Sequence, residues 1–173
     1  MKKISFATIL LLFTTITMMS CRAQQSTQQV EVRNNQILSA GKQVAVIESI
    51  CDVLICTFFI RNSEGRNLIT IVERDFIDPA EKRDTPHPNP NNGRVFYLRF
   101  SFADGRGVAE TQNVRIARNA QKQVIAATVV MSNLIQNGEL NDDAVRDFIQ
   151  THGTRFTDRR EQIQSNIHQI IVR

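Results

Sequence analysis

The sequence predicts an α+β domain, in which an antiparallel β-meander of five or six strands is followed by three helices packed on the sheet. Segments with alternating apolar residues, the pattern of half-buried strands, fill residues 30–111. From residue 113 onward the apolar residues recur every three or four positions, as in a helix with one buried face. Strands followed by helices, rather than alternating with them, favour an antiparallel sheet covered by helices.

Length and composition are typical of one globular domain behind a leader. The 173 residues are 42% hydrophobic and 22% charged, which predicts a single domain over residues 30–173. The formal charge is +4, and two of the 21 basic residues are Lys2 and Lys3, so residues 21–173 carry +2. This small excess predicts no nucleic-acid partner, because proteins that bind nucleic acids concentrate basic residues in stripes.

The first 20 residues have the composition of a bacterial signal peptide. Lys2 and Lys3 form a positive start, residues 4–19 are an apolar run, and the small Ser20 precedes Cys21. The run is shorter than the ~20 residues that span a bilayer. We therefore expect residues 1–20 to be removed on export.

The segment Met18-Met19-Ser20-Cys21 resembles a bacterial lipobox, although Met18 stands where Leu is usual. The resemblance implies that Cys21 receives diacylglycerol and that cleavage occurs just before it. Cleavage after Ala23 is the alternative. Arg22, in place of Asp, resembles the pattern of lipoproteins sent to the outer membrane.

The lipid anchor predicts the location of the protein and one of its partners, the membrane. Two or three acyl chains hold a domain on a bilayer, whereas one chain binds only marginally. Residues 21–29 contain four Gln and no large apolar side chain, which predicts a flexible tether. We therefore expect an envelope protein on the outer membrane, facing the periplasm or the surface.

Strands are predicted from residue 30 to residue 77, with turns at Asn34-Asn35 and Ala40-Gly41. Residues 53–61 are apolar on both faces, which is typical of a central strand. A hairpin loop at residues 62–65 leads into the strand 67–77.

The 17-residue segment from Asp78 to Arg94 interrupts the strands and holds all four prolines. It exceeds the ~12–15 residues beyond which loops are uncommon and often functional. We predict a mobile, exposed loop, with Lys82 and Arg83 as the first sites of limited proteolysis. It is also the predicted contact for a protein partner.

The strand 96–102 has the clearest alternation in the chain. It places Phe96 and three further apolar residues on a buried face and Tyr97 on a wet face. A hairpin at Asp104-Gly105 returns the chain along residues 108–111.

The first helix is predicted over residues 113–138. Its apolar face should hold Ile116, Ala120, Ala127, Val130, Met131 and Leu134. Residues 124–131 are apolar all round, so we expect the sheet and at least one other helix to cover Ala127. The β-branched residues of this stretch leave a strand as the competing interpretation.

Two further helices complete the predicted domain. Asn141 should cap a helix that ends near Gly153. Its inward residues are Val145, Phe148 and Ile149. Thr157 should cap a last helix, whose apolar stripe is Ile163, Ile167, Ile170 and Ile171.

No specific catalytic, metal or cofactor motif occurs in the sequence. None of His87, His152 and His168 has the spacing of a metal ligand with Cys or an acid, so we expect no metal and no cofactor. The leading hypothesis is therefore a non-catalytic binding or scaffolding protein of the envelope. An inhibitor or immunity-type protein that acts through the loop 78–94 is one alternative.

A hydrolase is the other alternative, and it would use the acidic run Glu73, Asp75, Asp78 and Glu81. Glu73 and Asp75 share a strand face about 7 Å apart, a separation at which paired carboxylates do acid–base chemistry. The nearby Arg74, Lys82 and Arg83 favour a solvated edge instead. A thiol enzyme would require Cys56 near His152 or His168.

Cys51 and Cys56 are predicted to be free thiols. On one extended segment they would lie about 16 Å apart, whereas a disulfide needs Cα atoms roughly 4.4–6.8 Å apart. Pairing would require a tight turn across residues 52–55, and Val53, Leu54 and Ile55 are poor turn residues.

Overall fold

The computed structural model describes residues 29–52, 55–84, 91–113 and 116–171. The predicted leader, Cys21 and most of the predicted tether lie outside the described residues. Among those that are described, no helix has the length and apolar character needed to cross a membrane.

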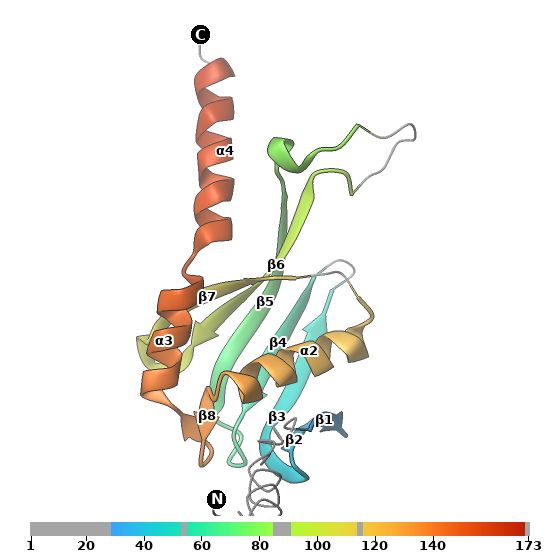
Figure 1. The fold of residues 1–173 in the computed structure, drawn as a ribbon, viewed down its shortest axis with the longest axis vertical. Helices are drawn as coiled ribbons and strands as arrows, with labels where there is room; N and C mark the ends of the chain where they lie inside the picture. Colours follow the sequence, from blue (N-terminus) through green and yellow to red (C-terminus); the bar gives the residue numbers. More distant parts are fainter. Residues whose placement is uncertain (1–28, 53–54, 85–90, 114–115, 172–173) are drawn as a thin grey trace, which may run out of the picture.

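The main sheet is an antiparallel meander in which each strand pairs with the next one along the chain (Figure 1). Its seven strands are β1 (Val30–Arg33), β2 (Gln36–Ser39), β3 (Lys42–Cys51), β4 (Cys56–Arg61), β5 (Asn67–Ile77), β6 (Arg94–Phe102) and β7 (Gly107–Gln112). The predicted α+β meander is confirmed, with more strands than the five or six expected. Asn34 and Asn35 both have positive φ, so the chain reverses there and β1 and β2 are separate strands.

The helices are α2 (Arg118–Met131), α3 (Asp142–His152) and α4 (Arg155–Ile171), and a hairpin of β8 (Ile135–Gln136) and β9 (Glu139–Leu140) joins the first two. Asn141 caps α3 and Gly153 follows its last residue, as predicted. The last helix begins at Arg155, before the expected Thr157. Helices α2 and α3 lie against the sheet, whereas α4 extends beyond it (Figure 1).

The hydrophobic core lies between the sheet and the first two helices. Its sheet residues include Ile47, Phe58, Ile60, Ile69, Ile71, Leu98 and Phe100, and its helical residues include Ile125, Ala126, Val129, Val145 and Phe148. Strand β4 is central, between β3 and β5, as its apolar residues predicted.

The buried face of α2 differs in part from the predicted one, because Val130 is buried as predicted but the other residues of α2 predicted for that face are not. Ile125, Ala126 and Val129 are fully buried, Ala127 is only partly buried, and Met131 remains 75% exposed. The expectation that Ala127 is covered on more than one side was therefore wrong. The strand alternative was also wrong, because residues 118–131 are helical.

A contact with the sheet edge explains the orientation of α2. The side-chain amide of Gln123 accepts a hydrogen bond from the backbone N of Val32 (3.0 Å) and donates one to the carbonyl of Val30 (2.7 Å). The Gln123 amide thus provides the backbone hydrogen-bond partners that a further strand would otherwise provide for the edge strand β1. The polar side chain therefore faces the protein, and the apolar Val124 next to it stays 44% exposed.

Candidate functional site

Strands β5 and β6 extend past their neighbours and form a two-stranded arm. Pairing of β5 with β4 ends at Val72, and pairing of β6 with β7 ends at Tyr97. Beyond both points, residues 75–77 continue to pair with residues 94–96. We call these residues, together with the short helix η1 (Pro79–Glu81), the arm (Figure 1).

Helix α4 is fastened to the sheet by Glu110, a fully buried carboxylate on β7. Glu110 accepts hydrogen bonds from the backbone N atoms of Phe156 and Thr157 (2.9 Å each) and from the Thr157 hydroxyl. Arg99 pairs with the same carboxylate at 3.0 Å. The first N–H groups of a helix have no partner within the helix and attract negative charge, so Glu110 fixes where α4 starts.

An ion pair and a ring contact join α4 to the arm. Arg159 donates from Nε and Nη2 to the two carboxylate oxygens of Asp78, at 2.8 and 2.9 Å. These bonds lower the pKa of Asp78 and raise that of Arg159, so both stay charged. Phe156 stacks on Tyr97 with ring centroids 5.2 Å apart. Tyr97 is therefore buried, and the prediction that it faces water was wrong.

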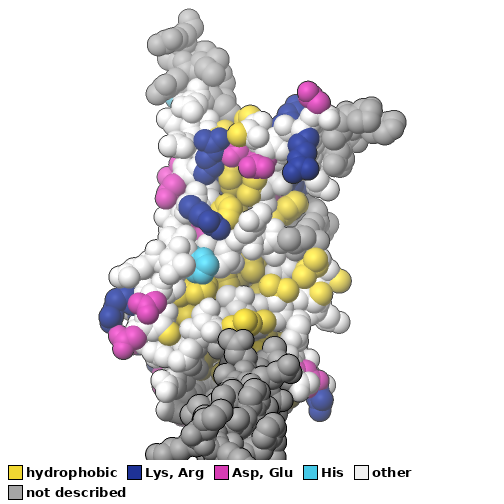
Figure 2. Space-filling view, viewed as in Figure 1, with side chains coloured by type: hydrophobic (Ala, Val, Ile, Leu, Met, Phe, Trp, Pro, Cys, Tyr) yellow, Lys and Arg dark blue, Asp and Glu magenta, His cyan; other side chains and the backbone are white. Residues whose placement is uncertain are grey.

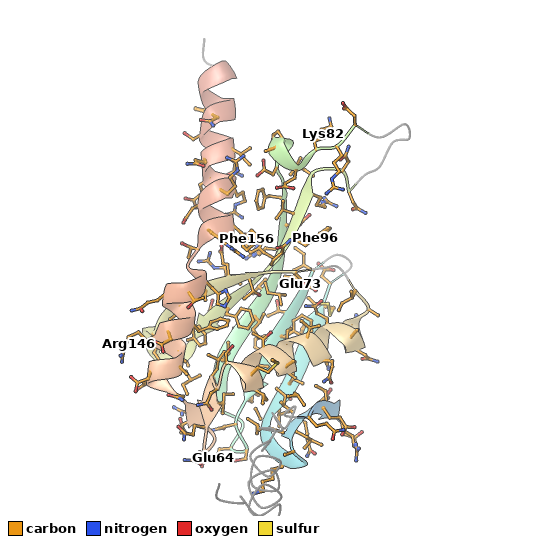
Figure 3. All side chains as sticks on the ribbon, viewed as in Figure 1. Glu64, Glu73, Lys82, Phe96, Arg146 and Phe156 are labelled. Carbon is orange, nitrogen blue, oxygen red and sulfur yellow. A yellow bond between two sulfur atoms is a disulfide. The ribbon has the colours of Figure 1, made fainter. Side chains whose placement is uncertain are left out.

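A cleft of about 700 Å³ lies between the arm and α4. Its lining includes three aromatic residues, Phe76, Phe96 and Phe156, four arginines, Arg83, Arg94, Arg155 and Arg159, and two acids, Asp78 and Glu81. On this face, basic side chains lie on both sides of an apolar strip with carboxylates between them (Figure 2). Phe96 comes from β6 and Phe156 from the start of α4, and both line the cleft (Figure 3).

The arginines of the cleft differ in their partners. Arg94 pairs with Asp75 through Nε at 2.6 Å, and Arg159 is held by Asp78. The guanidinium of Arg155 lies over the Phe156 ring, 4.7 Å from its centroid, and no carboxylate among the described residues pairs with it. The lining thus has more positive than negative groups, and Arg155 is among the cations available to a ligand.

The predicted acidic run does not form one site. Glu73 accepts a hydrogen bond from the backbone N of Cys56 (3.1 Å), and Asp75 pairs with Arg94. Both line a small pocket of about 110 Å³ beside the cleft. Asp78 turns to α4, and Glu81 lies on the exposed η1. Each of the first three carboxylates therefore has a donor of its own. Glu73 and Asp75 share the small pocket, as their common strand face predicted, whereas Asp78 and Glu81 line the cleft instead.

The predicted loop 78–94 is packed at its base. Asp78 is only 6% exposed, and its backbone N donates to the Gly93 carbonyl at 2.8 Å. The amide of Asn92 binds the backbone N and O of Arg83. The expectation of an exposed loop was therefore wrong for Asp78 and Gly93, which are buried, whereas Lys82 and Arg83 are exposed as predicted. His87 lies outside the described residues.

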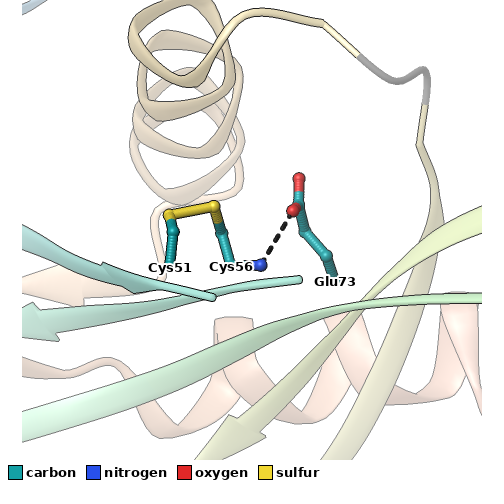
Figure 4. Close-up of a disulfide and its surroundings, with 3 residues drawn as sticks. All are labelled: Cys51, Cys56 and Glu73. Carbon is teal, nitrogen blue, oxygen red and sulfur yellow. Dashed lines mark hydrogen bonds between the residues drawn. A yellow bond between two sulfur atoms is a disulfide. The ribbon is translucent and has the colours of Figure 1, made fainter. Parts of the chain in front are cut away.

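Cys51 and Cys56 form a disulfide at the end of the β3–β4 hairpin (Figure 4). They are cross-strand partners with Cα atoms 4.1 Å apart. The backbone N of Asp52 donates to the carbonyl of Ile55 at 3.0 Å, so the chain reverses between the cysteines. The prediction of free thiols was wrong because it assumed an extended segment, and Cys56 is no thiol nucleophile in this state.

Alkylation tests the disulfide. Unreduced, denatured protein should show no labelling of Cys51 or Cys56 in mass spectrometry, and reduction should expose both. Removing the bond with the Cys51→Ser/Cys56→Ser double variant should lower stability by about 2 kcal/mol, as expected for a short closed loop. Reductant should lower the melting temperature of the parent protein and leave that of the variant unchanged. Two labelled thiols without reduction would contradict the disulfide.

The described histidines take structural positions. His152, on α3, packs its ring 4.4 Å from that of Phe148, and burial, with a contribution from Arg155, lowers its pKa. The neutral imidazole is therefore favoured. His168 lies on the exposed side of α4. No group of His, Cys, Asp or Glu among the described residues has the arrangement of a metal site.

Glu110, Arg155, Phe156 and Arg159 are the residues that sequence reasoning missed. The spacing of Arg155 and Arg159 by one helical turn is a signal that would have placed them on one helix face. Nothing local marked Glu110, because an acid in a short strand is normally solvated. Its role depends on α4, which follows more than 40 residues later.

Comparisons with known proteins add no relative from which a role could be transferred. No protein-family model matches the chain, and neither a curated protein nor a solved structure does.

Proposed function

We propose that this chain is an exported, lipid-anchored protein of the bacterial cell envelope that binds a partner, without catalysis, in the cleft between the arm and α4. The observation that carries the binding role is the way the cleft is built. Its two walls come from distant parts of the sequence and are tied by Asp78 and Arg159. Its lining combines apolar rings with a few polar groups, the usual chemistry of binding sites.

The contacts of the acidic residues favour binding over hydrolysis. A general acid or base must reach the reacting group of a substrate. Glu73 instead accepts a backbone hydrogen bond, and Asp75 and Asp78 each pair with an arginine. These carboxylates act as structural partners of the arm.

Two features support the location. The Lys2 to Cys21 segment has the order of a lipoprotein signal. The disulfide is of a kind that persists in oxidising compartments outside the cytoplasm.

Metabolic labelling tests the anchor. The mature protein should incorporate labelled palmitate and partition into detergent, because Cys21 would carry acyl chains that favour the bilayer. Cys21→Ala should abolish the label and leave the leader uncut. A soluble product that begins at Gln24 would contradict the lipid anchor but would still agree with export of the protein.

Site-specific photocrosslinking in intact envelopes tests the binding role. A photoreactive residue at Arg83, on the exposed side of the cleft, should give discrete adducts. The matched control is the same residue at Asp143, an exposed position on α3 away from the cleft. No adduct at position 83, or the same adducts at both positions, would contradict the cleft as the binding site.

A further inference from the structure

The cleft contains a short sheet edge that has no neighbouring strand among the described residues. Strand β7 pairs with β6 only as far as Tyr97, and one more bond follows, from the backbone N of Asn113 to the Phe96 carbonyl (2.9 Å). Alternate residues of a strand direct their backbone groups to the same side. Arg94 therefore faces the same side as Phe96, and among the described residues no donor reaches its carbonyl. An added strand would find a backbone acceptor here.

The arginines beside this edge retain donors for a ligand. A guanidinium has five N–H groups. Asp75 uses the Nε of Arg94, and Asp78 uses the Nε and Nη2 of Arg159. Arg155 lies over the Phe156 ring, and no carboxylate among the described residues pairs with it. Each of the three can donate to an added carboxylate while keeping its present contacts.

We propose that the cleft binds an acidic peptide segment of a partner protein in an extended conformation. The segment lies along the β6 edge at Arg94 and Phe96, and its carboxylates bind Arg94, Arg155 and Arg159. Its apolar side chains pack on the three aromatic residues of the cleft, Phe76, Phe96 and Phe156, which we call the aromatic floor. The backbone acceptor and the aromatic floor favour a peptide over a phosphate or a lipid headgroup, neither of which would use them. This inference rests on the proposed function, because it names the class of partner for the same cleft.

Fluorescence anisotropy with defined probes tests the inference on the full lipidated protein in detergent. The probe is a labelled ten-residue peptide of alternating Glu and Val with one central Phe. It should bind at low salt and weaken at 0.15 M salt, because exposed charges are screened. The same peptide with Lys for Glu should not bind. An acidic peptide with N-methylated backbone should bind at least tenfold more weakly, since it has lost its donors to the edge.

Charge-changing variants locate the interaction. Arg155→Glu should weaken the acidic probe at least tenfold, and Arg155→Ala should weaken it less. The matched control is Arg118→Glu, the same change at an exposed position on α2 outside the cleft lining. Both substitutions lie in the first turn of a helix, where an acidic side chain is favourable, so both variants should fold. Unchanged melting curves would show this.

Three results would overturn the acidic peptide as the occupant. These are no binding of the acidic probe, equal weakening by Arg155→Glu and Arg118→Glu, and Arg155-dependent binding to phosphatidylglycerol vesicles in place of the peptide. In each case, adducts at position 83 in the envelope would still support the cleft as a binding site. Failure of the peptide inference is thus distinguishable from failure of the proposed function.

Discussion

Replacing Glu110 with alanine is expected to destabilise the domain by about 3 kcal/mol, because the donors that surround this fully buried carboxylate lose their acceptor. The change leaves Arg99 without its carboxylate and leaves the backbone N–H groups of Phe156 and Thr157 without acceptors. These groups lie at the base of α4, so its first turn should separate from β7. The melting temperature should fall by roughly 10 °C.

Hydrogen exchange separates this local effect from general destabilisation. The amides of Phe156 and Thr157 should lose protection in the Glu110→Ala variant before the amides of the core strands do. Glu64→Ala is the matched control, because Glu64 is an exposed acid in the β4–β5 turn, at the end of the sheet away from the cleft (Figure 3). Similar melting of the two variants would contradict the anchoring role of Glu110.

The variant Ala126→Asp should prevent stable folding or lower stability by several kcal/mol. Ala126 is fully buried between α2 and the sheet, and the core around it offers no partner for a carboxylate among the described residues. Loss of soluble protein, or a much lower melting temperature measured by circular dichroism, is the expected result.

Ala127→Asp is the informative comparison, since helical periodicity alone had predicted Ala127 to be the buried position. Ala127 is partly exposed in the structure, so its substitution should cost much less than that of Ala126. Ala120→Asp, at an exposed position of the same helix, should have little effect. If Ala127→Asp lowered stability more than Ala126→Asp, the observed orientation of α2 would be wrong.

The local pattern of residues was sufficient to predict much of the fold. Alternation of apolar side chains predicted β6, and a stretch that is apolar on both faces predicted the central β4. Turn residues predicted the return strands β5 and β7, and the caps Asn141 and Gly153 predicted the bounds of α3. These features arise within a few residues, where side-chain periodicity and backbone geometry act directly. The orientation of α2 could not be predicted in this way, because it depends on the edge of β1, about 90 residues away.

The candidate site followed the same division. The sequence indicated that residues 78–94 were unusual and supplied the acids and the arginines, but it could not pair them. Asp78 meets Arg159 across 81 positions, and Glu110 meets Phe156 across 46. Such contacts depend on the residue at which β7 ends and on the direction that α4 takes from the sheet. Neither can be predicted from local sequence preferences.

By itself, the sequence determined the α+β class, the order of strands and helices, and the expectation of an exported chain. Those properties follow from composition and from periodicity within short segments. The disulfide, the buried anchor at Glu110 and the cleft exist only in the tertiary structure. Each of them depends on how the chain reverses or docks, because a residue's burial and partners are set by segments that arrive from elsewhere in the chain.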